Sequence, residues 1–162
     1  MNSTIDKKHL YQLLDEFDVA MLVTHSNTKI HARPMVVARL EQEMCTYLVT
    51  ELNSVKVDEI SANPQALLSF QSTRQFASLS GELELVKDRT LVELMWKEIW
   101  KVWFPKGKSD PNFAVLKFVP SEGEFWDNAG MLGLKYVYNA AKAYVAGQTP
   151  EVNKDQHAKV AL

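Results

Sequence analysis

The pattern of apolar and polar positions predicts helices near both ends of the chain and strands between them. Residues 4–17 carry apolar side chains at helical spacing, from Ile5 through Leu10, Leu13 and Leu14 to Phe17, and Thr4 can cap them. From residue 19 the period changes to segments rich in β-branched and apolar residues. Six strands are predicted, at residues 19–25, 30–40, 44–50, 66–71, 77–85 and 112–119.

Two of these strands show informative local patterns. Residues 26–29, Ser-Asn-Thr-Lys, separate the first two strands and have the composition of a hairpin turn. In the fifth strand, Ala77, Leu79, Leu83 and Leu85 share one face while serines and glutamates occupy the other. That strand is therefore expected to be half-buried.

Three further helices are predicted. Residues 54–62 form a short helix that Asn63-Pro64 ends, and residues 130–147 form a C-terminal helix. Between them, Asp88 can cap a helix that ends at Pro105 and Gly107 and places Trp96, Trp100 and Trp103 on one stripe, for core packing or a subunit contact. The last dozen residues are predicted to be a polar tail.

Short strands with a few helices predict a mainly β fold, a small six-stranded antiparallel barrel with helical decoration. We expect one domain over 1–162, with an N-terminal helix in 1–18, the barrel in 19–127, and a C-terminal helix and tail in 128–162. The sequence has no glycine-rich phosphate loop. A nucleotide would have to be held in another way.

Composition narrows the function classes. With 162 residues, 46% of them hydrophobic, and a formal net charge of −2, nothing favours binding to nucleic acid or to an anionic membrane. The single Cys45 excludes an intrachain disulfide, and the four histidines do not cluster at metal-ligand spacing. No apolar stretch approaches the ~18 residues needed to cross a bilayer. These features predict a cytoplasmic protein without a metal site.

Arg33 is the first residue that suggests chemistry. Strand alternation places His31, Arg33 and Met35 on one face, and Pro34 lacks the N–H for a ladder hydrogen bond. The strand should therefore be an edge there, or be approached by something other than a strand. The arginine has two interpretations, a surface ion pair or a contact to an anion or cofactor.

The start of the helix at 54–62 is the second candidate. Ser54 or Asn53 can cap it, and Lys56 in its first turn opposes the positive end of the helix dipole. A lysine there is unfavourable unless an anion shares the site. The alternative is a capped helix with a solvated lysine.

Several segments in order resemble the flavin-binding split-barrel family, whose founding enzyme is pyridoxamine 5′-phosphate oxidase. Within it the general stress protein 26 subgroup is most similar, on residues 103–107, Asp110-Pro111, 124–127, 140–143 and Gly147 with Thr149 to Glu151. The family-wide likeness rests on 33–37, 46–50, 54–56, 63–66, 74–82 and 120–126.

The resemblance implies an FMN-binding six-stranded Greek-key split barrel that forms a homodimer with FMN at the subunit interface. Arg33 and Lys56, with Ser54, would hold the FMN phosphate. The backbone at Pro34 and Met35 and the segment Val49-Thr50 would lie along the flavin. Gln75 would approach the ring or the ribityl chain, and Trp126 would come from the other subunit.

Three departures from the family pattern bear on function. True pyridoxamine phosphate oxidases carry basic residues where this chain has Ala38 and Leu132-Gly133-Leu134, and an arginine where it has Val55. Apolar side chains cannot grip a substrate phosphate, so vitamin B6 oxidation is disfavoured and FMN affinity is expected to be modest.

Three functions remain open. The first is an FMN oxidoreductase reduced by NADH or NADPH, with an unknown acceptor and no catalytic side chain identified. The second is a non-catalytic flavin-binding or sensor dimer in a stress response. The third is a barrel that does not bind flavin and either acts as a dimerising module or binds another planar ligand, such as haem or a deazaflavin.

Overall fold

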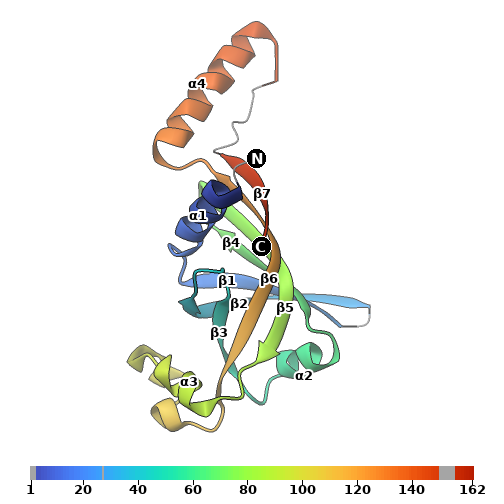
Figure 1. Ribbon diagram of the computed structural model, residues 1–162, viewed down its shortest axis with the longest axis vertical. Helices are drawn as coiled ribbons and strands as arrows, with labels where there is room; N and C mark the ends of the chain where they lie inside the picture. Colours follow the sequence, from blue (N-terminus) through green and yellow to red (C-terminus); the bar gives the residue numbers. More distant parts are fainter. Residues whose placement is uncertain (1–2, 27, 150–155) are drawn as a thin grey trace.

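A computed structural model describes residues 3–26, 28–149 and 156–162 (Figure 1). Seven strands and four α-helices make up most of it. The strands are β1 (Val19–Ser26), β2 (Lys29–Leu40), β3 (Thr46–Glu51), β4 (Gln65–Gln71), β5 (Gln75–Leu85), β6 (Phe113–Asp127) and β7 (His157–Ala161). The helices are α1 (Ser3–Leu14), α2 (Val55–Ala62), α3 (Arg89–Leu94) and α4 (Gly130–Ala146), with 3-10 turns at Glu98–Val102 and Gly107–Ser109.

Six strands close into an antiparallel barrel, which confirms the predicted fold. The sheet order is β3-β2-β1-β4-β5-β6-β7, and β3 also pairs with β6. Residues 113–118 of β6 pair with β3, and residues 122–126 pair with β7 outside the ring. Ser26 pairs with Lys29 across the predicted hairpin, whose Asn27 lies outside the described residues.

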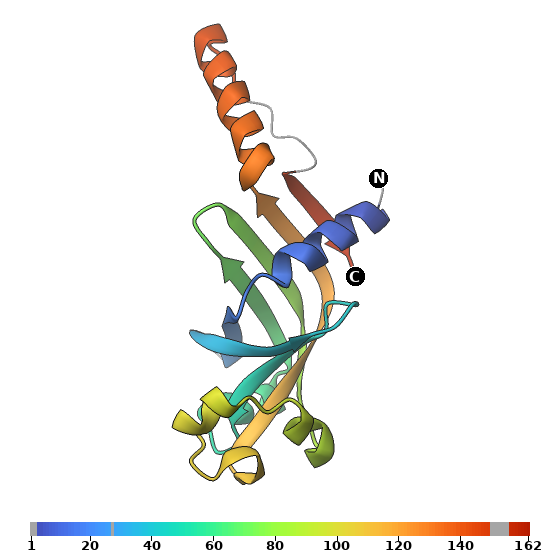
Figure 2. The ribbon, with the colours of Figure 1, turned by 90° about the vertical axis from the view of Figure 1, so that its left-hand side faces the viewer.

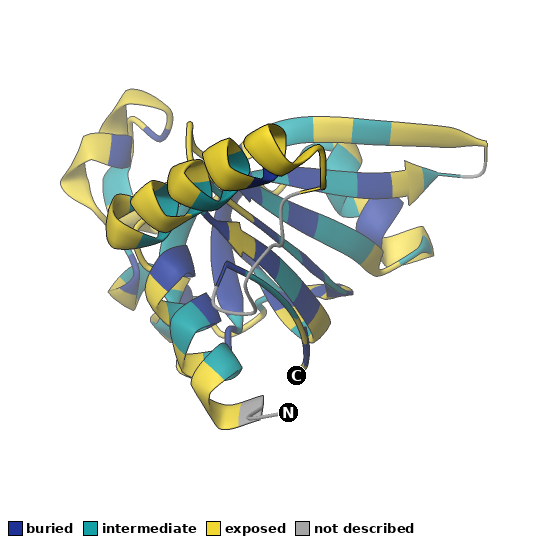
Figure 3. Ribbon diagram, turned by 90° about the horizontal axis from the view of Figure 1, so that it is seen from above, coloured by how far each residue is buried: buried dark blue, intermediate teal, exposed yellow. Residues whose placement is uncertain are grey.

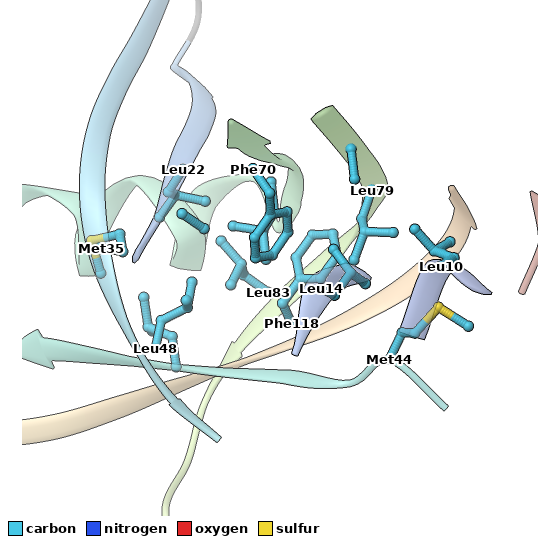
Figure 4. Packing of buried hydrophobic residues seen from close by; sticks show 14 of the residues in the cluster. Leu10, Leu14, Leu22, Met35, Met44, Leu48, Phe70, Leu79, Leu83 and Phe118 are labelled. Carbon is cyan, nitrogen blue, oxygen red and sulfur yellow. The ribbon is translucent and has the colours of Figure 1, made fainter. Parts of the chain in front are cut away.

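The main core lies inside the barrel and beneath α1 (Figures 2 and 4). The alternation in β5 is confirmed, since Ala77, Leu79 and Leu83 are buried and the glutamates between them are exposed. Gly81 is required where β5 crosses β6, because a Cβ there would lie 2.2 Å from the carbonyl oxygen of Val119. The register between the two strands shifts at this point.

Strand β6 is longer than predicted. The sequence pattern predicted a strand over residues 112–119, but the strand continues to Asp127. Pro120 faces Gly81 at the register shift, where the ladder is already irregular. The strand thus tolerates the missing N–H.

The single tryptophan helix predicted from Asp88 is wrong. Asp88 does cap α3, but Lys97 is extended and interrupts the helix, and the chain continues as a 3-10 turn. Trp96, Trp100 and Phe104 instead pack around Phe113, with ring centroids 5.1–6.0 Å from it. Packing around one aromatic ring overrides the helical period, so Trp100 is buried while Trp103 is 55% exposed.

The predicted polar tail is also wrong over its last residues. Residues 157–161 form β7, which pairs antiparallel with β6, and Val160 is buried in the main core. The strand has only five residues, and it forms because one edge of β6 is free to pair with it. That edge cannot be seen in the sequence.

The predicted C-terminal helix is confirmed as α4, which projects away from the barrel (Figures 1 and 2) and is mostly exposed (Figure 3). It ends at Gly147, whose φ of 66° is left-handed. Six of its large apolar side chains are 64–87% exposed: Met131, Leu134, Val137, Tyr138, Tyr144 and Val145. No helix among the described residues is long and apolar enough to span a membrane.

Candidate anion-binding site at the start of helix α2

Arg33 points from β2 toward α2 and is held there on two sides. Its Nη1 donates to the hydroxyl of Thr24 at 2.6 Å, and its Nη2 donates to Oε2 of Glu59 at 2.9 Å. The side chain is 23% exposed, so part of the guanidinium remains accessible. Of the two interpretations from the sequence, the ion pair is present, although it is largely buried.

Glu59 is a central residue that the sequence reasoning missed. Its side chain is 6% exposed, and it also accepts from the hydroxyl of Thr24 at 2.9 Å and contacts Nδ1 of His31 at 2.5 Å. Burial raises the pKa of this carboxyl, but the hydrogen bonds from Thr24, His31 and Arg33 and the arginine charge lower it further than burial raises it. Glu59 is therefore a buried carboxylate. The sequence feature that could have indicated Glu59 is that His31 and Arg33 share one strand face. Two basic side chains on one face favour an acidic side chain on the element packed against it.

The first turn of α2 presents the amides of Val55 and Lys56, whereas the Val57 amide donates to the backbone carbonyl of the cap residue Ser54 at 2.9 Å. Ser54 is the N-cap, as predicted, but its hydroxyl donates to the carbonyl of Glu51 at 2.7 Å and makes no capping hydrogen bond. An N-cap side chain normally accepts from these amides. The helix start thus keeps its capacity to bind an anion.

Lys56 lies in this first turn and is partly buried. Burial lowers the pKa of its ammonium group, and the nearby charge of Arg33 lowers it as well, while Glu51 and Glu59 act in the opposite direction. A cation with a lowered pKa gains from a bound anion. Arg33, Lys56 and the α2 amides therefore form a set of donors suited to an anionic group.

The other predicted residues of this half lie on β2 and β3. Pro34 is exposed and pairs only with Met21 of β1, because β2 meets β3 only from Val37 onward. The predicted local edge at Pro34 is thus present. Met35 and Thr50 are buried, and the side chain of Val49 packs in the aromatic cluster around Trp100.

Gln75 and Trp126 lie elsewhere in the same chain. Gln75 opens β5, and β1 and β4 separate that strand from β2. Trp126 is 36% exposed on β6 beside Phe76 and stacks on His157, with centroids 5.1 Å apart and planes 9° apart. One chain therefore brings Arg33, Ser54 and Lys56 to the α2 side of the barrel and leaves Gln75 and Trp126 away from them.

No side-chain arrangement suited to a metal ion occurs in the part of the chain that the structure describes. Pro150 and Glu151, which were part of the general stress protein 26 resemblance, lie outside that part. The groups available for chemistry at the site are therefore a partly buried arginine, a partly buried lysine, one buried carboxylate and the amides at the start of a helix.

Comparison with solved structures finds the same fold in several bacterial proteins. A candidate general stress protein 26 from Jannaschia sp. CCS1 is 23% identical, with 98% of this chain and 99% of that chain covered and a TM-score of 0.77. General stress protein 26 from Bacillus anthracis str. Sterne is 22% identical, with 74% and 92% covered and a TM-score of 0.67.

A third neighbour is the general stress FMN/FAD binding protein from Xanthomonas citri. It is 25% identical, with 80% of this chain and 92% of that chain covered and a TM-score of 0.67. A comparison with curated proteins finds no match. The model of the family described as pyridoxamine 5'-phosphate oxidase like matches residues 6–151, and the chain belongs to that family.

Proposed function

We propose that this protein is an FMN-binding flavoprotein whose flavin phosphate is held at the start of α2. The observation that carries the proposal is the set of donors formed by Arg33, Lys56 and the amides of α2. The hydroxyl of Ser54 lies beside them and makes no capping hydrogen bond to these amides. A phosphate monoester is an anion that such a set can bind. The Xanthomonas citri neighbour, named for FMN/FAD binding, supports flavin as the ligand class.

The exposed backbone at Pro34 fits this reading. No strand pairs with β2 on its β3 side before Val37, so a flat ligand can approach the chain between Pro34 and the Val49-Thr50 segment. Ser54 adds a hydroxyl next to the phosphate position. FMN, when bound, would supply the redox chemistry, and these residues would supply its binding and orientation.

The homodimer is part of the same proposal. Gln75 and Trp126 lie away from Arg33 in one chain, so a second copy is the source of a residue such as Trp126 at the flavin. The apolar side chains of α4 support association. At about 100° per residue, positions 131, 134, 137, 138, 144 and 145 fall within an arc of roughly 140°. Such a face is typical of a helix that packs against another chain.

We further propose that NADH or NADPH reduces the flavin, which then passes electrons to a small acceptor. Glu59 is held as a carboxylate by three partners, so it is not free to donate a proton to a substrate. The residues of this chain therefore bind and orient the flavin. Pyridoxamine phosphate is not the proposed substrate, since Ala38, Leu132 and Leu134 offer no charge to its phosphate.

The spectrum of freshly purified protein tests this proposal. We expect flavin absorption bands that bleach under anaerobic conditions when NADH or NADPH is added and return when an acceptor is supplied. Flavin bands without bleaching would favour the non-catalytic flavin-binding dimer. Haem or deazaflavin bands instead of flavin bands would contradict FMN as the ligand.

A further inference from the structure

The two cations of the α2 site have carboxylates beside them before any ligand binds. Arg33 and Lys56 contribute two positive charges, and Glu59 and Glu51 contribute two negative ones. The two carboxylates differ in their surroundings. Glu59 is buried and bonded to Arg33, whereas the side chain of Glu51 is exposed to solvent.

The buried carboxylate should matter more for ligand binding than the exposed one. Water and salt screen the charge of Glu51, but they screen a charge inside the barrel far less. One terminal nitrogen of the Arg33 guanidinium already donates a hydrogen bond to Glu59, and the other already donates one to Thr24. A phosphate must therefore share the arginine with an anion that is already in place.

The hydrogen bonds of Glu59 indicate that it is a fixed part of the site. Thr24 on β1, His31 and Arg33 on β2, and the helix that carries Glu59 are tied together by one carboxyl group. Thr24 itself is 2% exposed. A carboxylate held by three partners cannot turn away when a ligand arrives.

We propose that Glu59 is a positioning residue that sets the selectivity of the site by acting through Arg33. As a permanent counter-charge it limits how much a ligand phosphate adds to affinity, so the site discriminates weakly between FMN and its dephosphorylated form, riboflavin. This inference rests on the proposed flavin function and extends it to the ligand class that the site accepts.

The test is a pair of fluorescence titrations, with FMN and with riboflavin, on the wild-type protein, Glu59→Gln and Glu51→Gln. Glutamine keeps the size of Glu59 and one accepting oxygen, removes the charge, and replaces the other oxygen by an amide nitrogen that donates. We expect Glu59→Gln to raise the preference for FMN over riboflavin by about tenfold or more. Riboflavin affinity should change little. Glu51→Gln, the same charge change in an exposed position, should shift the preference by less than about threefold.

The ratio of the two affinities separates this role from a purely structural one. A loss of local structure would weaken both flavins together and leave their ratio unchanged. An unchanged or lower FMN preference in folded Glu59→Gln, as judged by circular dichroism, would overturn the inference while the flavin proposal stands. The ratio of FMN to riboflavin affinity in the wild-type protein is a second test that needs no variant. A wild-type preference for FMN above about a hundredfold would also overturn the inference. Binding of neither flavin would overturn the proposed function and this inference with it.

Discussion

The guanidinium of Arg33 and the carboxylate of Glu59 lie 2.9 Å apart, so the cation assigned to a ligand phosphate is already paired within the chain. The pair joins β2 to α2 and fixes the position of the helix start relative to the barrel wall. A ligand that binds there meets an ordered arrangement of donors. The same pair makes barrel stability and ligand binding depend on one charge.

The stability of the fold should depend on the ionisation of Glu59. The pKa of its carboxyl is lowered in the folded protein from the ordinary 4.5. The ionised form therefore adds stability above that value, and this contribution is lost as the pH falls through the lower folded-state pKa. We expect the difference in unfolding free energy between wild type and Glu59→Gln to be constant near neutral pH and to shrink in acid.

Urea unfolding at a series of pH values measures this difference. The exposed Glu122→Gln on β6 is the control, and it should follow the wild type throughout. A Glu59→Gln difference that stays constant from neutral pH down to about pH 3 would contradict a carboxylate stabilised by Thr24, His31 and Arg33.

The tryptophans of the segment after α3 should contribute unequally to stability. Trp100 is 2% exposed and packs on Phe113, so Trp100→Ala should lower the unfolding free energy by about 3–5 kcal/mol. Trp103 is 55% exposed, and Trp103→Ala should lower it by less than about 1 kcal/mol. Equal effects in chemical denaturation would favour the regular tryptophan helix that the sequence pattern predicted.

The last strand should be part of the cooperative fold. Val160 is 4% exposed, so Val160→Asp buries a charge without a partner and should lower the unfolding free energy by about 3 kcal/mol or more. Its neighbour Ala161 is exposed and lies opposite Glu122 of β6, so Ala161→Lys introduces a charge without a like-charged neighbour across the sheet and should be nearly neutral. Thermal unfolding followed by circular dichroism compares the two, and a neutral Val160→Asp would show that β7 does not hold in solution.

Association of two copies should depend on the apolar face of α4. Leu134 is 69% exposed, and a Leu134→Asp change places a charge in the middle of that face. We expect this variant to shift the protein from dimer toward monomer in sedimentation velocity experiments. Lys135 is an exposed neighbour outside the arc, and Lys135→Asp should leave the dimer intact. A dimer that survives Leu134→Asp would place the contact elsewhere on the barrel.

Local patterns predicted most of the fold. Alternation in β5, the hairpin between β1 and β2, the stop at Asn63-Pro64 and the glycine end of α4 each depend on neighbours in the chain. Such features are visible in a sequence because their cause is local. Barrel closure by β3 and β6 followed from the number and kind of strands.

Features that depend on distant partners could not be predicted. The helix after Asp88 breaks because Trp96, Trp100 and Phe104 converge on Phe113 of β6. Residues 157–161 become a strand because an edge of β6 is free to receive them. At the candidate site, the sequence indicated the cations but not Glu59, whose role depends on how α2 docks against β1 and β2.

Titration of the flavin-free protein with FMN tests the central claim most directly. We predict saturable quenching of flavin fluorescence with close to one FMN per chain. Exchange of both cations, Arg33→Ala with Lys56→Ala, should weaken FMN binding by about tenfold or more, because the hydrogen bonds from both cations to the phosphate are lost. A control with Lys29→Ala and Arg39→Ala removes two exposed cations of the same strand and should bind as the wild type does. No saturation at roughly 100 µM FMN, or an affinity that the Arg33 and Lys56 changes leave unaltered, would contradict the account.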